Sequence, residues 1–215
     1  MAAELHLALA GEPVVLHADR ALYWPRGGSL MIADLHLGKG DAFRRAGVAV
    51  PSGGTRDDLA RLDRLVRHFE PRSLWILGDV LHGAVHDVGW RATWAAWRDA
   101  HTALDVAAVI GNHDRALADA RLGIAMLGRG IDAGPFALRH EPAASPLHVV
   151  CGHLHPWVRL PGLGMRRWPA FWLGEGTTVL PAFSAFTGGA PIPAGEGTRV
   201  VVCADGAIAE VGARA

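Results

Sequence analysis

Residues 29–36, SLMIADLH, are the stretch that decides the fold. The apolar run SLMI predicts a buried β-strand, and Asp34 and His36 follow it directly. Residues 55–69 place leucine, valine and phenylalanine at helical spacing, and residues 73–79, SLWILGD, predict a second buried strand. This alternation of strand and helix indicates an α/β first half.

The pattern continues with a helix over 88–104 and a third strand over 105–114. Trp90, Trp94 and Trp97 recur at i, i+4 and i+7, a stripe more typical of core packing than of a binding platform. Glycine and proline separate five further strand candidates, at 136–140, 147–155, 165–173, 177–183 and 198–211, the last with a hairpin turn at ADGA. We therefore expect an α/β fold of two packed mixed β-sheets flanked by helices, with residues 1–215 as one domain.

The charge balance limits the classes of function. The 215 residues carry 21 basic and 21 acidic side chains, which excludes a generally basic mode of nucleic-acid binding but allows a local basic patch. All basic residues except Lys39 are arginine, a bias that suits phosphate recognition or reflects a GC-rich genome. We predict a cytoplasmic protein. The sequence has only two cysteines, its N-terminus lacks the basic region of a signal peptide, and it has no apolar run of membrane-spanning length.

Potential metal ligands stand at the ends of five successive strands. They are Asp34 and His36, Asp79, Asn112, His140, and His153 with His155. Ligands bind beyond the carboxyl ends of strands in open α/β sheets, where loops converge. Since residues i and i+2 of a strand share a face, we expect Asp34 and His36 to reach one ion together, and likewise His153 and His155.

Hydrolysis of a phosphate ester explains these residue types. It needs an activated water and neutralised phosphoryl oxygens, and two divalent metal ions supply both. Carboxylate, imidazole and amide donors together suit Mn, Fe or Zn. Glycines before Asp79, Asn112 and His153 allow tight turns and keep bulk away from the ions.

The ordered motifs DLH, GDVLH, GNHD, H and GHLH, from Asp34 to His155, resemble those of the calcineurin-like metallophosphoesterases. The resemblance implies a four-layer sandwich and a phosphoesterase in which a metal-bridging hydroxide attacks phosphorus in line. It implies one ion bound by Asp34, His36, Asp79 and His155, and another bound by Asp79, Asn112, His140 and His153.

The same resemblance makes His113 the general acid that assists the leaving group. Many relatives carry an aspartate three residues after the bridging aspartate, whereas this chain has His82. His82 is then a neighbour of the ligands, a substrate contact or a second acid. Asp114 has two interpretations, a site residue or a cap of the following helix.

Longer segments, among them DLHLGKGDAFRRAGVAVPSGGT and VLPAFSAFTGG, resemble the bacterial metallophosphoesterases associated with a DNA ligase and a helicase in DNA-repair operons. This implies a manganese-dependent phosphodiesterase that acts as an endonuclease on DNA, with single-stranded DNA as the expected substrate. The alternatives are a phosphatase or phosphodiesterase of small molecules or nucleotides, and a non-enzymatic scaffold that has lost its metals.

Several arginines are candidates for contacts with a phosphate backbone. We predict substrate binding by Lys39, Arg44, Arg45 and Arg115, and expect Arg159, Arg166 and Arg167 near the same rim. The alternative is that they only solubilise the surface. Trp157 and Trp168 either stack on bases or pack in the core.

Overall fold

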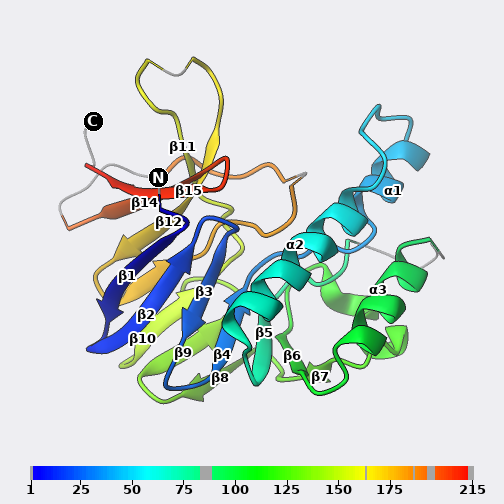
Figure 1. The fold of residues 1–215 in the computed structure, drawn as a ribbon, viewed down its shortest axis with the longest axis horizontal. Helices are drawn as coiled ribbons and strands as arrows, with labels where there is room; N and C mark the ends of the chain where they lie inside the picture. The colour runs from blue at the N-terminus through cyan, green and yellow to red at the C-terminus, as the bar shows by residue number, and fades with distance from the viewer. Residues whose placement is uncertain (1, 83–88, 163, 186, 193–196, 213–215) are drawn as a thin grey trace.

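The structure is a computed structural model that describes residues 2–82, 89–162, 164–185, 187–192 and 197–212. Two β-sheets pack together, and helices cover the outer face of the first (Figure 1). His86 and the expected start of the helix at Val88 lie outside the described residues.

The first sheet has seven strands in the order of the chain. Its antiparallel part is β1 (Glu4–Leu9), β2 (Glu12–His17), β3 (Ala21–Trp24) and β4 (Ser29–Ile32). Its parallel part continues from β4 through β5 (Ser73–Leu77), β6 (Asp105–Val109) and β7 (Ala125–Met126). Parallel neighbours need long crossover connections, and helices α2 (Gly54–Phe69) and α3 (Gly89–Ala100) lie in them. A short helix, α1 (Lys39–Arg45), precedes α2.

The second sheet is also mixed and has the order β15-β14-β12-β13-β10-β9-β8. Its strands are β8 (Gly130–Ala133), β9 (Phe136–Arg139), β10 (His148–Cys151), β12 (Trp168–Gly174), β13 (Thr177–Val179), β14 (Arg199–Ala204) and β15 (Ala207–Val211), and β11 (Trp157–Val158) pairs with β12. The expected hairpin at ADGA is confirmed: Ala204 pairs with Ala207 across Asp205 and Gly206. Both turn residues have positive φ, as a two-residue hairpin turn requires.

Alternate residues of the central strands belong to two different cores. Leu30 and Ile76 face α2 and α3, where Leu62 and Trp94 are fully buried. Met31 and its neighbours on the other face pack against the second sheet. This double burial explains why the strands are continuously apolar in sequence.

The expected sandwich of two mixed sheets flanked by helices is confirmed. The described helices α1, α2 and α3 lie with the first sheet, and two small apolar clusters lie on the outer face of the second. No helix among the described residues is long and apolar enough to cross a membrane.

Two other features differ from the expectation. Strands β1 to β3 and helix α1 are not among the predicted elements, because each is short: the strands have four to six residues and the helix has seven. Strand β4 ends at Ile32, before the two expected ligands, so these belong to the following loop.

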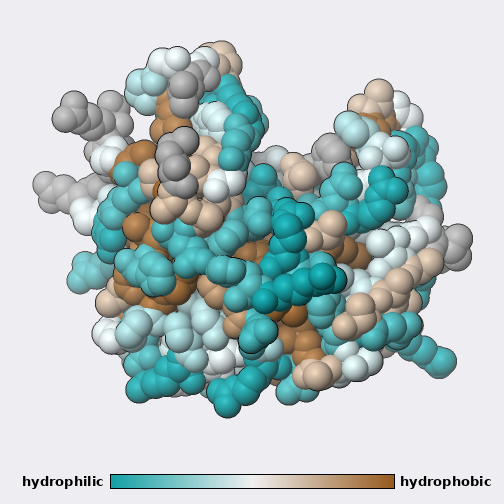
Figure 2. All heavy atoms as spheres, viewed as in Figure 1, coloured by the Kyte–Doolittle hydropathy of each residue, from teal (hydrophilic) through white to brown (hydrophobic). Residues whose placement is uncertain are grey.

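In the space-filling view, the outline of the molecule is hollowed between the β11–β12 loop and α1 (Figure 2).

The tryptophan stripe on α3 is buried as predicted, and the indole N–H of Trp94 donates to the Leu122 carbonyl at 2.8 Å. We expect Trp94→Ala to lower the free energy of unfolding by about 3–5 kcal/mol, because it leaves a large cavity. Urea denaturation followed by far-UV circular dichroism measures this. Met165→Ala, at a residue 74% exposed, is the control and should change stability by less than about 0.5 kcal/mol. Equal effects of the two substitutions would contradict the packing role.

Candidate metal centre

The predicted ligands meet where five parallel strands end. Asp34, Asp79 and Asn112 follow β4, β5 and β6 of the first sheet. His140 and His153 follow β9 and β10, which are parallel neighbours in the second. An isolated bridge between Ala33 and Ala182 and hydrogen bonds between the loops join the two sheets at this edge.

The backbone around these residues differs from the expected strand. Asp34, His36, Asp79, His153 and His155 all have positive φ, between 47° and 67°. The side chains therefore converge because the loops adopt left-handed conformations. The prediction that they converge because alternate residues of a strand share a face is wrong. Aspartate and histidine adopt this conformation more readily than most residues. The expected pairing of Asp34 with His36 nevertheless holds in space.

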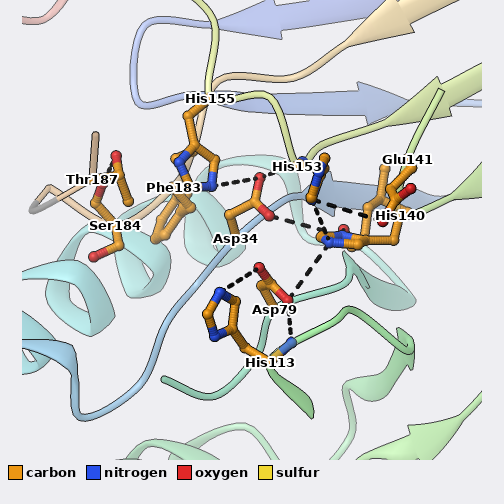
Figure 3. A network of polar contacts seen from close by, with 12 residues as sticks. Asp34, Asp79, His113, His140, Glu141, His153, His155, Phe183, Ser184 and Thr187 are labelled. Atoms are coloured by element: carbon orange, nitrogen blue, oxygen red, sulfur yellow. Dashed lines mark hydrogen bonds and ion pairs between the residues drawn. The ribbon is translucent and has the colours of Figure 1, made fainter. Parts of the chain in front are cut away.

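A first group of donors consists of Asp34, His36 and His155, whose ligand atoms lie within 4.8 Å of one another. The imidazole Nε2 of His155 is 3.6 Å from Asp34 Oδ2 (Figure 3). Burial, helped by the nearby Lys39 ammonium, lowers the pKa of His36 to about 2, so this imidazole is neutral and keeps its lone pair. Asp34 Oδ1, both nitrogens of His36 and His155 Nε2 are buried without a hydrogen-bond partner in the described chain.

A second group consists of Asp79, His140 and His153. His140 Nε2 is 3.6 Å from Asp79 Oδ1 and 3.1 Å from His153 Nδ1, and Asn112 Oδ1 lies 2.9 Å from the same nitrogen. On its other side His140 Nδ1 is 3.9 Å from Asp34 Oδ1, so the two groups adjoin through this ring. The expected donors are thus brought together in two adjacent sets (Figure 3).

The donor set fits a pair of divalent ions. The His140 Nδ1–H donates to the Leu77 carbonyl at 3.0 Å, which leaves Nε2 free to ligate, the arrangement usual for metal-binding histidines. Carboxylates and neutral imidazoles suit transition metals such as Mn, Fe or Zn. The buried donors without partners are costly in a folded protein unless an ion satisfies them. Two candidate metal sites, side by side, are therefore built into the fold.

Glycines make room for these donors, as the sequence suggested. A Cβ added at Gly78 would overlap the His140 ring, and one added at Gly152 would overlap Ala33 and the Asp34 carboxylate. Gly78 also has a φ of 82°. Any larger side chain at either position would displace a donor.

His113 and His82 lie together at the entrance to the centre. Their rings stack, with centroids 5.5 Å apart and planes inclined by 27°. The His113 side chain is 42% exposed, and its Nε2 is 3.9 Å from Asp79 Oδ2. Burial, and after it the charges of Lys39 and His113, lower the pKa of His82. His82 belongs to neither donor group, and its proposed roles stay predictions.

The four predicted substrate contacts are placed differently from one another. Lys39 is buried, and this burial lowers its pKa. The nearby carboxylates of Asp34 and Asp79 only partly oppose the lowering. Arg44 pairs with Asp41 and donates to the Pro51 carbonyl. Arg45 and Arg115 are exposed. Contact of any of them with substrate stays a prediction.

Asp114 is a support of the site. Its carboxylate is 2% exposed and accepts the backbone N–H groups of Leu81 and Gly111, both at 2.9 Å. It thereby joins the loop after Asp79 to the loop before Asn112. The 3-10 helix that begins here has no side-chain cap, so the capping interpretation is not what the carboxylate does.

Sequence reasoning missed a second support, the loop after β13. The Ser184 N–H donates to the Asp34 carbonyl at 3.2 Å. Arg20 donates to three carbonyls of this loop, and Arg61 donates to the Phe183 carbonyl and pairs with Asp58 at 2.9 Å. The apolar neighbours of Asp58 and Arg61 on a helical pattern were the only local signal. The carbonyls that Arg20 and Arg61 contact lie more than a hundred residues away in the chain.

Comparisons with known proteins agree with this geometry. The family model described as calcineurin-like phosphoesterase matches residues 29–180. The crystal structure of Pseudomonas putida nuclease MPE is similar at 35% identity and a TM-score of 0.85, over 97% of this chain and 100% of that one. A phosphoesterase from E. coli, Yfce, has 17% identity and a TM-score of 0.48 over 85% and 97% of the two chains. None of the curated proteins compared matches.

The two donor groups lead to a prediction about metal binding. Equilibrium dialysis of metal-stripped protein against Mn²⁺, followed by elemental analysis, should give one ion for each group. His36→Ala should remove only the ion of the first group, and His153→Ala should weaken only the second. His148→Ala is the control, because this half-buried histidine bonds Thr178 Oγ1 and belongs to neither group. Unchanged binding in both site variants would contradict the assignment.

Proposed function

The chain belongs to the calcineurin-like phosphoesterase family, and on that basis we propose that it is an endonuclease that hydrolyses phosphodiester bonds of DNA. That it is a metal-dependent phosphoesterase follows from the family and from the two adjacent donor groups. The observation that carries the choice of a nucleic acid is the similarity, over 97% of this chain and at 35% identity, to a nuclease. The choice of DNA comes from the resemblance of the longer segments to the DNA-repair subfamily.

We assign the ligands as the family motifs imply. Asp34, His36 and His155 would hold one ion and Asn112, His140 and His153 the other, with the Asp79 carboxylate between them. The bound ions would supply a nucleophile at neutral pH and neutralise the phosphoryl oxygens. The protein fixes the donors: the N–H of His153 donates to Asp34 Oδ2 at 2.9 Å, and the N–H of His113 donates to Asp79 Oδ1 at 3.0 Å.

We propose that His113 Nε2 gives a proton to the leaving oxygen. Its ring is exposed at the entrance to the centre, while its backbone is fixed to Asp79. His82 stacks on it where many relatives carry an aspartate, so no carboxylate from that position supports the proton on His113. His82 then acts by orienting the His113 ring.

Finer features of the proposal come from the resemblance of the longer segments. We propose manganese as the physiological metal, single-stranded DNA as the substrate, and a functional link to a DNA ligase and a helicase. A cytoplasmic location agrees with two free buried cysteines, Cys151 and Cys203, whose thiol pKa values are raised to about 12 by burial. Residues 1–215 would act as one domain, since one apolar core joins the two sheets.

Incision of a circular single-stranded DNA tests the proposal. Metal-stripped protein should linearise the circle only when Mn²⁺ is added. Asp79→Ala should abolish the cut, because the family motifs make this carboxylate a ligand of both ions. His148→Ala should cut as the wild type does. Hydrolysis of a generic phosphodiester without any incision would instead identify an enzyme of small-molecule phosphodiesters.

The role of His113 predicts a dependence on the leaving group. His113→Ala should lower the rate on DNA, whose leaving oxygen is a poor one, by about a hundredfold or more. It should have a much smaller effect on a nitrophenyl ester, whose leaving group departs without a proton. Single-turnover rates on both substrates measure this. Equal losses on both would contradict general-acid catalysis by His113.

A further inference from the structure

A small basic pocket adjoins the metal centre on the side of His155. Its volume is about 160 Å³, and its walls include Arg20, Trp157, Arg166, Arg167 and Thr187. Among the described residues, its lining includes three arginines and neither aspartate nor glutamate. Since His155 belongs to the first donor group, a ligand in this pocket would lie next to a group bound at the metals.

The three arginines of the pocket are held in different ways. Arg20 is anchored by the carbonyls of residues 182–184 and stays cationic although burial lowers its pKa to about 10. Arg166 forms two hydrogen bonds with Asp205, at 2.7 and 3.0 Å, and lies 3.8 Å from the Trp168 ring centroid. Arg167 is exposed and has no carboxylate partner among the described residues. Its charge is therefore available to an anion.

The tryptophans of the β11–β12 hairpin position these guanidinium groups. Arg167 and Arg159 lie over Trp157, 4.6 and 5.4 Å from its ring centroid. The hairpin register pairs Trp157 with Pro169 and Val158 with Trp168, so Arg159 and Arg167 stand opposite each other one residue beyond the ladder. Trp168 is 7% exposed. Trp168 is thus packed, and guanidinium groups lie over the ring of Trp157. Because these rings are already covered, a phosphate fits this pocket better than a base does.

The opposite side of the centre has a different character. A larger pocket of about 450 Å³ lies beside Asn112 and His140, but its lining includes Glu141. Its Arg139 is paired with Asp132 at 2.7 Å. Figure 3 shows Thr187 at one end of the site and Glu141 at the other, with the two aspartates between them. The lining of this larger pocket is therefore of mixed charge, with Arg129, Arg139 and Glu141, whereas the charged residues in the described lining of the pocket beside His155 are arginines.

We propose that the pocket beside His155 is a phosphate subsite, in which Arg167 binds the phosphodiester group of a single strand adjacent to the one being hydrolysed. The inference rests on the proposed nuclease function. A strand bound here would leave the metal centre along the β11–β12 hairpin, whose loop extends beyond the sheets (Figure 1). Planar guanidinium groups fixed over aromatic rings lose little freedom when they bind phosphate oxygens.

Two substrates separate the subsite from the metal centre. A single-stranded oligonucleotide would occupy both, whereas bis(p-nitrophenyl) phosphate has one phosphate and needs the metal centre alone. Arg167→Gln should lower kcat/KM on the oligonucleotide about tenfold, mainly through KM, and reduce the slope of log kcat/KM against log salt by about one. Arg167→Lys should recover part of the loss. Both variants should hydrolyse bis(p-nitrophenyl) phosphate as the wild type does.

Arg26→Gln is the matched control. It removes the same charge from an exposed arginine in the turn before β4, at the opposite end of the strand that leads to Asp34. An equal loss in Arg26→Gln, an unchanged oligonucleotide rate in Arg167→Gln, or equal losses on both substrates would each overturn the subsite. If the wild type hydrolyses bis(p-nitrophenyl) phosphate and cuts no oligonucleotide, the proposed function itself fails.

Discussion

The metal centre depends on left-handed backbone conformations at the ends of the strands. Five donor residues adopt positive φ, a conformation that costs on the order of 1 kcal/mol or more for each residue other than glycine. Hydrogen bonds between neighbouring loops offset this cost: the N–H of Asp34 donates to the Gly78 carbonyl, and the N–H of His36 donates to the Asp79 carbonyl at 2.8 Å. The strain persists because two packed sheets hold the loops from both sides.

Side chains that are not candidate ligands also fix several loops of the centre. The Asp114 carboxylate joins the second and third loops, and Arg20 and Arg61 hold the loop that supports Asp34. Asp114 is buried and the two arginines are partly buried, and each accepts or donates more than one hydrogen bond, the condition under which burial of a charge is tolerated. Precise placement of donors is what a two-ion reaction requires, since a small displacement changes the distance between the ions. The cost of buried charge is therefore coupled to catalysis.

Much of this was predictable from sequence, because motif residues and apolar periodicity are local signals. The candidate donors, the parallel strands and the buried Trp94 all follow from short patterns, and the two groups of donors lie together as expected. The local backbone at Asp34 was not predictable, since positive φ depends on the contacts of the loop. The partners of Arg20 lie 162–164 residues away in the chain, and no periodicity reports a contact between such distant segments.

The only lysine of the chain, Lys39, begins helix α1 inside the metal centre, where it is 8% exposed and its N–H donates to the His36 carbonyl at 3.1 Å. A lysine-specific protease therefore has one peptide bond to cut, and that bond lies at the start of helix α1, directly after the loop that carries the first donors. The amount of uncut chain reports how often this loop opens. Because all other basic residues are arginine, cleavage at Lys39 alone measures local order beside the candidate active site.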